Sequence, residues 1–384
     1  MTEKNTIVFI NQNAGYLMID IINAHTQYKQ RTIIAGKLVP RNTPIDPSVK
    51  FEKIITYNRS TGVKRMLTWA VGFIQILWLV KTRYRKAELF IVTNPPFAGL
   101  IPLFCRNPFS ILVFDIYPDV LIAYKFLQND YLVTKWWRNA NRKVFQKAKK
   151  VFTISAGMKE VLGQYTNGEK IKTVPLWADN RFLKPVAKAS NIFIQQHHLH
   201  NKFLVVYSGN IGHSHSVEVM IEIAQKIVDP DILFVIIGEG DKRQQVDELI
   251  KKYELNNCLL LPWQNVELLS HSLSAADLAV VTLGKEAAAF SIPSKTFSLM
   301  SVGAPLLCIA DESSELASLV SKHQIGKCFD AHETEAMMAF ILSVKSDKGY
   351  HHQLSANALK ASEEYGPANA LKFIEPRIVN TATV

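Results

Sequence analysis

The sequence predicts an α/β protein with two doubly wound, mainly parallel sheets, each in a domain of its own. Three observations support this prediction. The chain of 384 residues is long enough for two hydrophobic cores. Short apolar runs alternate with helix-like stretches along most of its length. The alternation begins again at Phe203, after an irregular stretch rich in turn-forming and polar residues.

The short apolar runs are the expected strands. In the first half they are Ile7–Asn11, Arg31–Gly36, Lys53–Tyr57, Glu88–Thr93, Ser110–Asp115 and Val151–Ser155, and in the second half Phe203–Tyr207, Ile232–Ile237, Leu259–Leu261 and Leu278–Leu283. Parallel sheets bind ligands beyond the carboxyl ends of their strands, so the loops after these runs are the candidate binding loops.

The expected domain boundaries follow composition. We expect an N-terminal domain at 1–180, a linker at 181–200 and a C-terminal domain at 201–366. Residues 367–384 are expected to form a C-terminal segment that returns to the first domain.

Charge is divided unevenly between the two halves. Residues 1–180 carry 26 Lys and Arg against 11 Asp and Glu, a net charge of +15, whereas residues 181–384 carry 18 against 22, or −4. The first half is therefore expected to face something anionic. Nucleic acid is disfavoured, because the chain has no zinc-binding spacing or RNA-recognition signature. Four scattered cysteines and the lack of a signal peptide are typical of a cytoplasmic protein.

Met66–Val80 is the most apolar segment of the basic half. As a helix it would be about 23 Å long, shorter than the hydrocarbon core of a bilayer at about 30 Å. Flanking lysines and arginines favour a helix lying on an anionic membrane, with Trp69, Phe73 and Trp78 in contact with lipid. The alternative is a core helix packed between the sheet and its neighbours.

Lys135–Lys150 repeats this pattern of tryptophans among cations. Trp136 and Trp137 stand beside basic residues at helical spacing, which is typical of a basic amphipathic helix at a membrane surface. The alternative is a solvated basic face over a packed apolar one.

Phe290–Pro305 is the segment with the clearest chemistry. Pro293 suits the start of a helix, which would place Ser294, Lys295 and Thr296 on its first turn. Unpaired backbone N–H groups and the helix dipole favour an anion there, so the segment predicts a diphosphate-binding site. An ordinary capped helix with a surface lysine is the alternative.

Glycine turns follow two strands of the second half. Gly209, Asn210 and Gly212 come after the first strand, and Gly238 and Gly240 come after the next, close to Lys242 and Arg243. Glycines allow backbone N–H groups to approach a phosphate, although a full G-x-G-x-x-G motif is absent.

Two acids, Asp115 and Asp119, flank Pro118 at a strand end in the first half. They could serve catalysis as paired carboxylates, or Asp119 could cap a helix and Asp115 could accept hydrogen bonds. Asp229-Pro230-Asp231 looks like the metal-binding Asp-x-Asp of some sugar transferases, but it precedes its strand as a turn, so we expect no metal site.

The order and spacing of these motifs resembles the family 4 glycosyltransferases of GT-B fold. The most similar branch is the bacterial one that builds surface polysaccharides, including fucosamine- and colanic-acid-type transferases. The motifs that carry the resemblance are Asp115–Asp119, Pro175–Asp179, Ser208–Gly212, Gly238–Gly240, Ser274–Asp277 and Pro293–Lys295.

The resemblance implies two facing Rossmann-like domains, a nucleotide-sugar donor in the second domain, an acceptor in the first, and no metal or other cofactor. Phe290 and Ser298 stand where many members carry glutamates, and His213 and His215 stand where an arginine and a lysine are usual. The residues implied at the donor site are Gly209, Asn210, Gly212, Gly238, Gly240, Lys242, Arg243, Trp263, Gln264, Val266, Phe290, Ser291, Ile292, Pro293, Ser294, Lys295, Thr296 and Ser298. The expected catalytic residues are Lys295 and Lys242, as cations for the leaving diphosphate, and Asp115, which would orient the acceptor hydroxyl. Gly15 and Asp119 are expected on the acceptor side.

We therefore expect a glycosyltransferase, hexosyl or N-acetylhexosaminyl in type, that acts at the cytoplasmic face of a membrane. It would move a sugar with retention to a lipid-linked or growing glycan acceptor. A nucleotide-sugar epimerase of the same fold and a non-catalytic scaffold in a polysaccharide assembly complex are the alternatives. The sequence does not define the oligomeric state, the sugar or the linkage.

Overall fold

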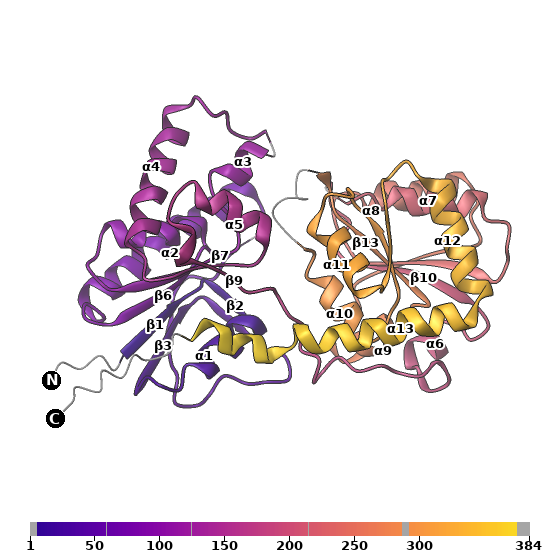
Figure 1. Cartoon of the computed structure of the whole chain (residues 1–384), viewed down its shortest axis with the longest axis horizontal. Helices are drawn as coiled ribbons and strands as arrows, with labels where there is room; N and C mark the ends of the chain where they lie inside the picture. Colours follow the sequence, from indigo (N-terminus) through magenta and orange to yellow (C-terminus); the bar gives the residue numbers. More distant parts are fainter. Residues whose placement is uncertain (1–5, 59, 124, 214, 286–291, 375–384) are drawn as a thin grey trace. The chain divides into compact units, whose positions relative to one another are not determined.

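The computed structural model describes residues 6–58, 60–123, 125–213, 215–285 and 292–374. The chain forms two compact units (Figure 1). The first contains Met1–Pro175 and Pro367–Val384, and the second contains Leu176–Gly366. The predicted linker at 181–200 is a part of the second unit, because η3 (Lys188–Ser190) and α6 (Ile192–Gln196) lie there and Phe193 is fully buried in its core.

The first unit is built on a parallel sheet in the order β5-β3-β1-β6-β7-β8-β9. Its strands are β1 (Thr6–Ile10), β3 (Gln30–Ala35), β5 (Lys50–Lys53), β6 (Glu88–Val92), β7 (Phe109–Val113), β8 (Val151–Thr153) and β9 (Ile171–Thr173), with β2 (Asn13–Gly15) and β4 (Lys37–Val39) paired beside it. The central strands are buried on both faces, as is usual for parallel sheets. The strand expected at Lys53–Tyr57 lies three residues earlier, at β5.

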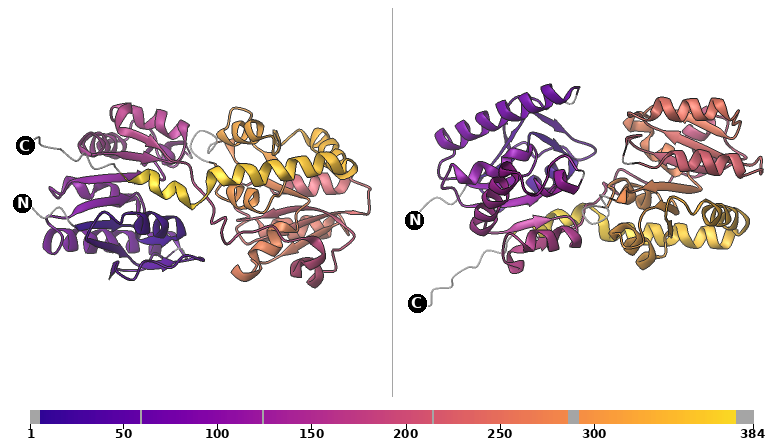
Figure 2. Two further views of the ribbon diagram at one scale, coloured as in Figure 1. Left: turned by 60° about the horizontal axis from the view of Figure 1, so that its bottom comes forward. Right: turned by 90° about the horizontal axis from the view of Figure 1, so that it is seen from above.

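Helices cover both faces of each sheet (Figures 1 and 2). In the first unit they are α1 (Tyr16–Ala24), α2 (Gly62–Thr82), η1 (Pro96–Leu103), α3 (Asp119–Ala123), α4 (Leu132–Lys147), α5 (Ala156–Gly163), η2 (Gly168–Lys170) and η7 (Pro367–Phe373). The last of these completes the first core, because the Phe373 ring lies 4.8 Å from Phe152 and 6.1 Å from Phe90, centre to centre.

Helix α2 is longer than expected and is fixed to the sheet on one side. It has 21 residues, about 32 Å at 1.5 Å per residue. Gln12, which follows β1, is fully buried and donates hydrogen bonds from Nε2 to the carbonyl oxygens of Thr68, in α2, and Ile55. A Cβ atom on Gly72 would lie 2.7 Å from this Nε2, so only glycine permits the close approach.

The second unit has a parallel sheet in the order β12-β11-β10-β13-β14-β15. Its strands are β10 (Phe203–Ser208), β11 (Ile232–Ile237), β12 (Cys258–Leu261), β13 (Leu278–Thr282), β14 (Leu306–Ile309) and β15 (Gly326–Phe329). Its further helices are α7 (Glu218–Lys226), α8 (Arg243–Lys252), η4 (Val266–Leu268), α9 (Leu269–Ser274), α10 (Lys295–Ser301), α11 (Glu315–His323), α12 (Thr334–Ser346), α13 (Lys348–Ser362) and η6 (Glu363–Tyr365).

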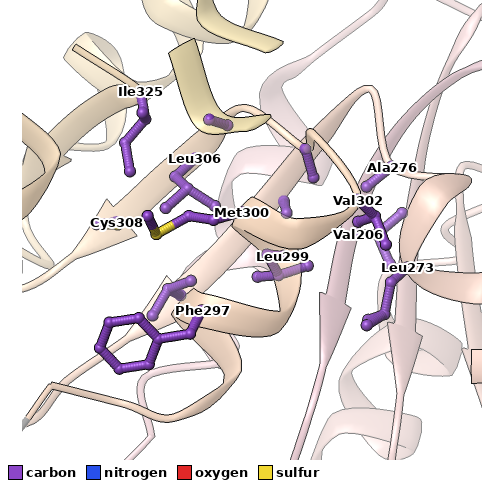
Figure 3. Close-up of a cluster of buried hydrophobic side chains, with 14 of the residues drawn as sticks. Val206, Leu273, Ala276, Phe297, Leu299, Met300, Val302, Leu306, Cys308 and Ile325 are labelled. Carbon is purple, nitrogen blue, oxygen red and sulfur yellow. The ribbon is translucent and has the colours of Figure 1, made fainter. Parts of the chain in front are cut away.

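Alternate residues of β10 enter different cores: Val206 belongs to the one around α10, and Val205 to the one around α7. Figure 3 shows the first of these cores, in which Phe297 and Met300 of α10 pack near Cys308 of β14. This packing holds α10, and with it Lys295, at the edge of the sheet where the strands end.

Candidate active site

The strand order of the second sheet places its reversal point between β10 and β13, where doubly wound sheets bind ligands beyond the strand ends. Gly209 follows β10 directly, and Thr282 is the last residue of β13. Lys295, the first residue of α10, reaches the same place. The structure thus brings together residues from two predicted motifs and from the strand predicted at Leu278–Leu283.

Lys295 has a buried ammonium group with an unusual environment. Its Nζ lies 3.7 Å from the centre of the Tyr207 ring, and a Cβ on Gly209 would come within 2.7 Å of it. Among the residues that the structure describes, no acceptor forms a hydrogen bond with this nitrogen. Burial lowers the pKa of Lys295 to about 7. A buried amine without a partner is costly, and an anion would remove that cost.

His215 lies beside this lysine, in the loop after β10. Its Nδ1 is 3.0 Å from the hydroxyl of Thr282. Burial, with the nearby charge of Lys295, lowers the pKa of His215 to about 4, so the imidazole is neutral at physiological pH. His215 can therefore offer a neutral donor or acceptor, but not a second cation. Tyr207 and His215 were not among the predicted site residues. The position of His215 after the glycine turn could have indicated a place in the site. The sequence around Tyr207 is that of an ordinary strand and gives no such indication.

The predicted glycines have different roles in the structure. Gly209 makes room for Lys295, but Gly238 and Gly240 pack the two loops together. Their φ angles are +153° and +152°, and Cβ atoms would lie 1.9 Å from the carbonyl oxygen of Gly209 and 2.5 Å from that of Ile211. These two residues are thus required by backbone packing. Gly212 is crowded by Asn210, whose side chain would lie 2.6 Å from its Cβ.

The two cations after the second glycine turn are engaged within the protein. Lys242 donates from Nζ to the carbonyl oxygen of His215 at 2.5 Å and to a carboxylate oxygen of Glu218 at 2.6 Å. Arg243 forms an ion pair with Glu239 at 3.2 Å. Lys242 therefore stabilises the loop that carries His215, whereas the ammonium of Lys295 is left for a ligand.

The other predicted donor residues belong to two segments, one after β12 and one at α10. Trp263 and Val266 are exposed after β12, and Gln264 donates to the carbonyl oxygen of Pro262 at 2.9 Å. These three stand two strands away from β10 in the sheet. Ile292, Pro293 and Ser294 precede α10, whereas Thr296 is fully buried and Ser298 is half-buried within it. Phe290 and Ser291 lie outside the described residues.

The first sheet has a reversal point of its own, between β1 and β6. A cavity of about 180 Å³ opens there, and Gly15, predicted on the acceptor side, is one of its lining residues. Asp115 follows β7, the next strand. Its residue is exposed, but the surrounding protein partly desolvates the carboxyl group, which raises its pKa.

The carboxylate of Asp119 is held by two side chains of the first unit. Arg138 donates to its Oδ1 from Nη2 at 2.8 Å and from Nε at 3.2 Å, and the Tyr165 hydroxyl donates to its Oδ2. Both carboxylate oxygens are thus occupied by α4 and by the segment after α5. Asp119 therefore has a structural role, although its partners are Arg138 and Tyr165 and not the backbone N–H groups expected of a helix cap, and Asp115 is left as the available acid.

The five residues predicted to touch a membrane divide into three groups. Trp78 and Trp136 are each 56% exposed. Trp69 is half-buried and stacks on Tyr57 at 5.7 Å, and Phe73 is half-buried against η1. Trp137 is a core residue, 8% exposed, with its ring stacked on Phe97 and Tyr117, so its predicted contact with lipid is wrong.

No group of three or more His, Cys, Asp and Glu side chains that could hold a metal ion occurs within the described residues.

Two Rossmann-like units, each with its ligand-binding edge at a strand reversal, define the GT-B class of glycosyltransferases, and the predicted fold class is confirmed by solved structures of that class. Residues 189–361, which make up most of the second unit, match the family described as glycosyl transferases group 1.

Two bacterial proteins named as glycosyltransferases are similar to this chain. A protein of Escherichia coli (strain K12) named as glycosyl transferase WcaI of colanic acid biosynthesis is 30% identical over 37% of this chain and 35% of its own length, so the match spans about a third of WcaI. The glycosyltransferase named WbjE of Pseudomonas aeruginosa is 24% identical over 82% of both chains.

Solved structures share the fold over nearly the whole chain. Anabaena HepE in complex with UDP has a TM-score of 0.70 at 14% identity, covering 96% of this chain and 97% of its own. WaaG, a glycosyltransferase of lipopolysaccharide biosynthesis, has a TM-score of 0.68 at 15% identity, covering 96% and 99%.

Proposed function

We propose that this protein transfers a sugar, with retention, from a nucleotide diphosphate sugar to a lipid-linked or growing glycan acceptor during synthesis of a bacterial surface polysaccharide. The second unit would bind the donor and the first the acceptor. The name of WcaI supports the process, the name of WbjE supports the transfer activity, and the structure of HepE in complex with UDP-glucose supports the class of donor.

The observation that carries this proposal is the unpartnered ammonium of Lys295 at the strand reversal of the second sheet. A diphosphate placed there would give the lysine the acceptor that the described residues do not provide and would restore its charge. As the bond from the sugar to the diphosphate breaks, negative charge grows on the leaving oxygens. A cation that is already positioned stabilises that charge without reorganisation. In this proposal the cation is Lys295, and no metal is required.

Substitution of the lysine tests the proposal. Lys295→Met keeps the apolar stem against Tyr207 and removes the charge, so folding should persist while turnover falls about 10²- to 10³-fold. Lys251→Met on α8, where the side chain is 74% exposed, is the matched control. A thermal-shift panel of uridine, guanosine and thymidine diphosphate sugars would select the donor for this assay. Near-normal turnover of Lys295→Met would contradict the proposal, and loss of turnover with EDTA would contradict its metal-free form.

We also propose that the first unit lies on the cytoplasmic face of an anionic membrane through one side of α2 and the start of α4. Large apolar side chains on α2 are 40–70% exposed at helical spacing: Val63, Met66, Leu67, Val71, Ile74 and Trp78. Leu132, Val133 and Trp136 of α4 are 50–85% exposed, and both helices pack against η1.

Helix α2 is long enough and apolar enough to cross a bilayer, and it is the one such helix in the described part of the chain. Its inner side is tied to the sheet, however, by Gln12 and by burial of Ile76, Leu79 and Val80. A helix held in this way favours a position along the membrane surface. Cations near its ends, among them Lys64, Arg65 and Arg83, would attract anionic headgroups. Co-sedimentation with vesicles measures this association.

A further inference from the structure

The cavity of about 180 Å³ at the strand reversal of the first sheet has a lining with a distinct chemistry. Its polar lining residues are mainly asparagines: Asn11 follows β1, Asn13 begins β2, and Asn94 follows β6. Leu17 of α1 and Phe114 beyond β7 belong to its apolar part. The cavity is large enough for several water molecules, which a small organic group could replace.

None of the residues lining this cavity is charged. A phosphate or carboxylate bound there would lose its hydration without gaining an ion pair, which is costly. The cation that touches the lining is Arg41, whose guanidinium carbon is 4.0 Å from the centre of the Tyr16 ring, but Arg41 does not itself line the cavity. The lining therefore favours an uncharged ligand.

Carboxamides select a particular kind of uncharged group. Each has a carbonyl oxygen that accepts and an NH₂ group that donates. The Oδ1 of Asn11 accepts a hydrogen bond from the backbone N–H of Asn13 at 3.2 Å, which fixes the orientation of this amide. An acetamido group matches such a lining, because its N–H and C=O complement carboxamides while its methyl group suits Leu17 and Phe114.

We propose that this cavity recognises the acetamido group of an N-acetylated sugar in the acceptor. The inference rests on the proposed function, because it takes the first unit as the acceptor side. It adds a chemical class to that function: the acceptor would end in, or carry close to its end, an N-acetylhexosamine or a related acetamido sugar.

Saturation-transfer NMR on the full chain tests the inference without turnover. The probes are the methyl β-glycosides of N-acetylglucosamine, glucose, glucosamine and glucuronic acid. We expect binding of the N-acetylglucosaminide, with the strongest saturation on its acetyl methyl, and at least tenfold weaker binding of the other three. Equal binding of the glucoside, or preference for the glucuronide through Arg41, would overturn the inference.

Two variants connect the binding to the cavity. Leu17→Trp should fill it, and Asn13→Leu should remove one carboxamide; each is expected to weaken N-acetylglucosaminide binding at least tenfold. Asn201→Leu, at an exposed position in the second unit, is the matched control. Melting temperatures report folding, and thermal shifts with nucleotide sugars report the donor site. Wild-type affinity in both variants would contradict the inference. If the wild-type protein bound the N-acetylglucosaminide but no nucleotide sugar, that result would contradict the proposed function and not the assignment of the cavity.

Discussion

The Nζ of Lys295 lies 3.7 Å from the centre of the Tyr207 ring, in the space that the missing side chain of Gly209 leaves open. The ring face provides weak stabilisation for a cation, and no hydrogen-bond acceptor reaches this nitrogen within the described residues. The lysine is therefore held in a position where a bound anion would change its protonation. This relationship leads to a measurable coupling between donor binding and pH.

Donor binding is expected to take up a proton. Below pH 7 Lys295, with a pKa of about 7, is already charged, so affinity is highest there and independent of this group. As the pH rises above 7 the free protein loses the proton, and binding must recover it; the logarithm of the association constant should then fall with a slope approaching −1 per pH unit. Calorimetry at pH 8 in HEPES and in Tris should report uptake of close to one proton.

Lys295→Met is the control for this coupling and should bind more weakly with no such slope. His215, whose pKa is lowered to about 4, stays neutral throughout this window and should not contribute. In the ligand-free protein the pKa of Lys295 is below its ordinary value of 10.5, so the wild-type protein should gain stability relative to the variant between about pH 7 and 10.5. Donor affinity that is flat from pH 6 to 9 would contradict the buried, unpartnered state.

Substitution by alanine should affect donor affinity at one glycine and stability at another. In Gly209→Ala the new methyl group would meet the flexible end of Lys295 at 2.7 Å, so the lysine moves, folding persists and donor affinity falls at least tenfold. In Gly238→Ala it would meet the carbonyl oxygen of Gly209 at 1.9 Å, at a φ of +153°, and we expect a loss of about 2 kcal/mol or more of unfolding free energy. Thermal unfolding and donor titration of both variants separate the roles; equal stability of the two would contradict them.

The sequence predicted most of the central strands, because buried parallel strands are continuous apolar runs, but β14 (Leu306–Ile309), which is also buried, was not predicted. The predicted run at Ile232–Ile237 coincides with β11, and Glu88–Thr93 extends one residue past β6. Edge strands lack this signal. β5 reads Lys-Phe-Glu-Lys with mostly exposed side chains, and β15 is short, with an exposed Lys327, so one was misplaced and the other was not predicted.

Site residues could be predicted only where neighbouring residues in the sequence indicate their role. Lys295 was identified from its place beside a proline and two hydroxyls. Lys242 forms an ion pair with Glu218, and Gly238 is required because its loop packs against Gly209. Both facts depend on contacts between loops that are far apart in the chain, which the local sequence does not indicate. Tyr207 ends an apolar strand, and nothing in its neighbours along the sequence indicates that its ring borders the lysine.

The two acids of one loop should also differ. Asp115→Asn should lower turnover about 10²-fold or more with an unchanged melting temperature, because the proposed role of its carboxylate is to orient the acceptor hydroxyl. Asp119→Ala should leave Arg138 and Tyr165 without their acceptor and cost on the order of 2 kcal/mol of stability, since Arg138 is partly solvated. Asp119→Asn, which keeps an acceptor oxygen, is expected to cost less. Chemical denaturation beside the transfer assay distinguishes the pair, and an unstable but fully active Asp115→Asn would reverse the assignment.

Membrane binding should depend on the exposed side of α2. The double substitution Leu67→Ser and Ile74→Ser removes two side chains that are 59% and 64% exposed and leaves the inner side of the helix intact. Burial of each in a membrane is worth about 1.5 kcal/mol or more, so partitioning to vesicles containing phosphatidylserine should fall at least tenfold. The wild-type protein should also bind these vesicles less well as salt increases, because its cations contribute.

The control for this pair is Val228→Ser in the second unit, which removes a side chain that is 92% exposed but belongs to neither α2 nor α4. Its partitioning should equal that of the wild-type protein. Because the substituted leucine and isoleucine face away from the sheet, the double variant should unfold at the wild-type temperature, so weaker binding would report the surface and not the fold. Unchanged sedimentation of the double variant would contradict a membrane role for α2. Light scattering that showed the wild-type protein as a dimer, and the variant as a monomer, would assign the same apolar side chains to a subunit interface instead.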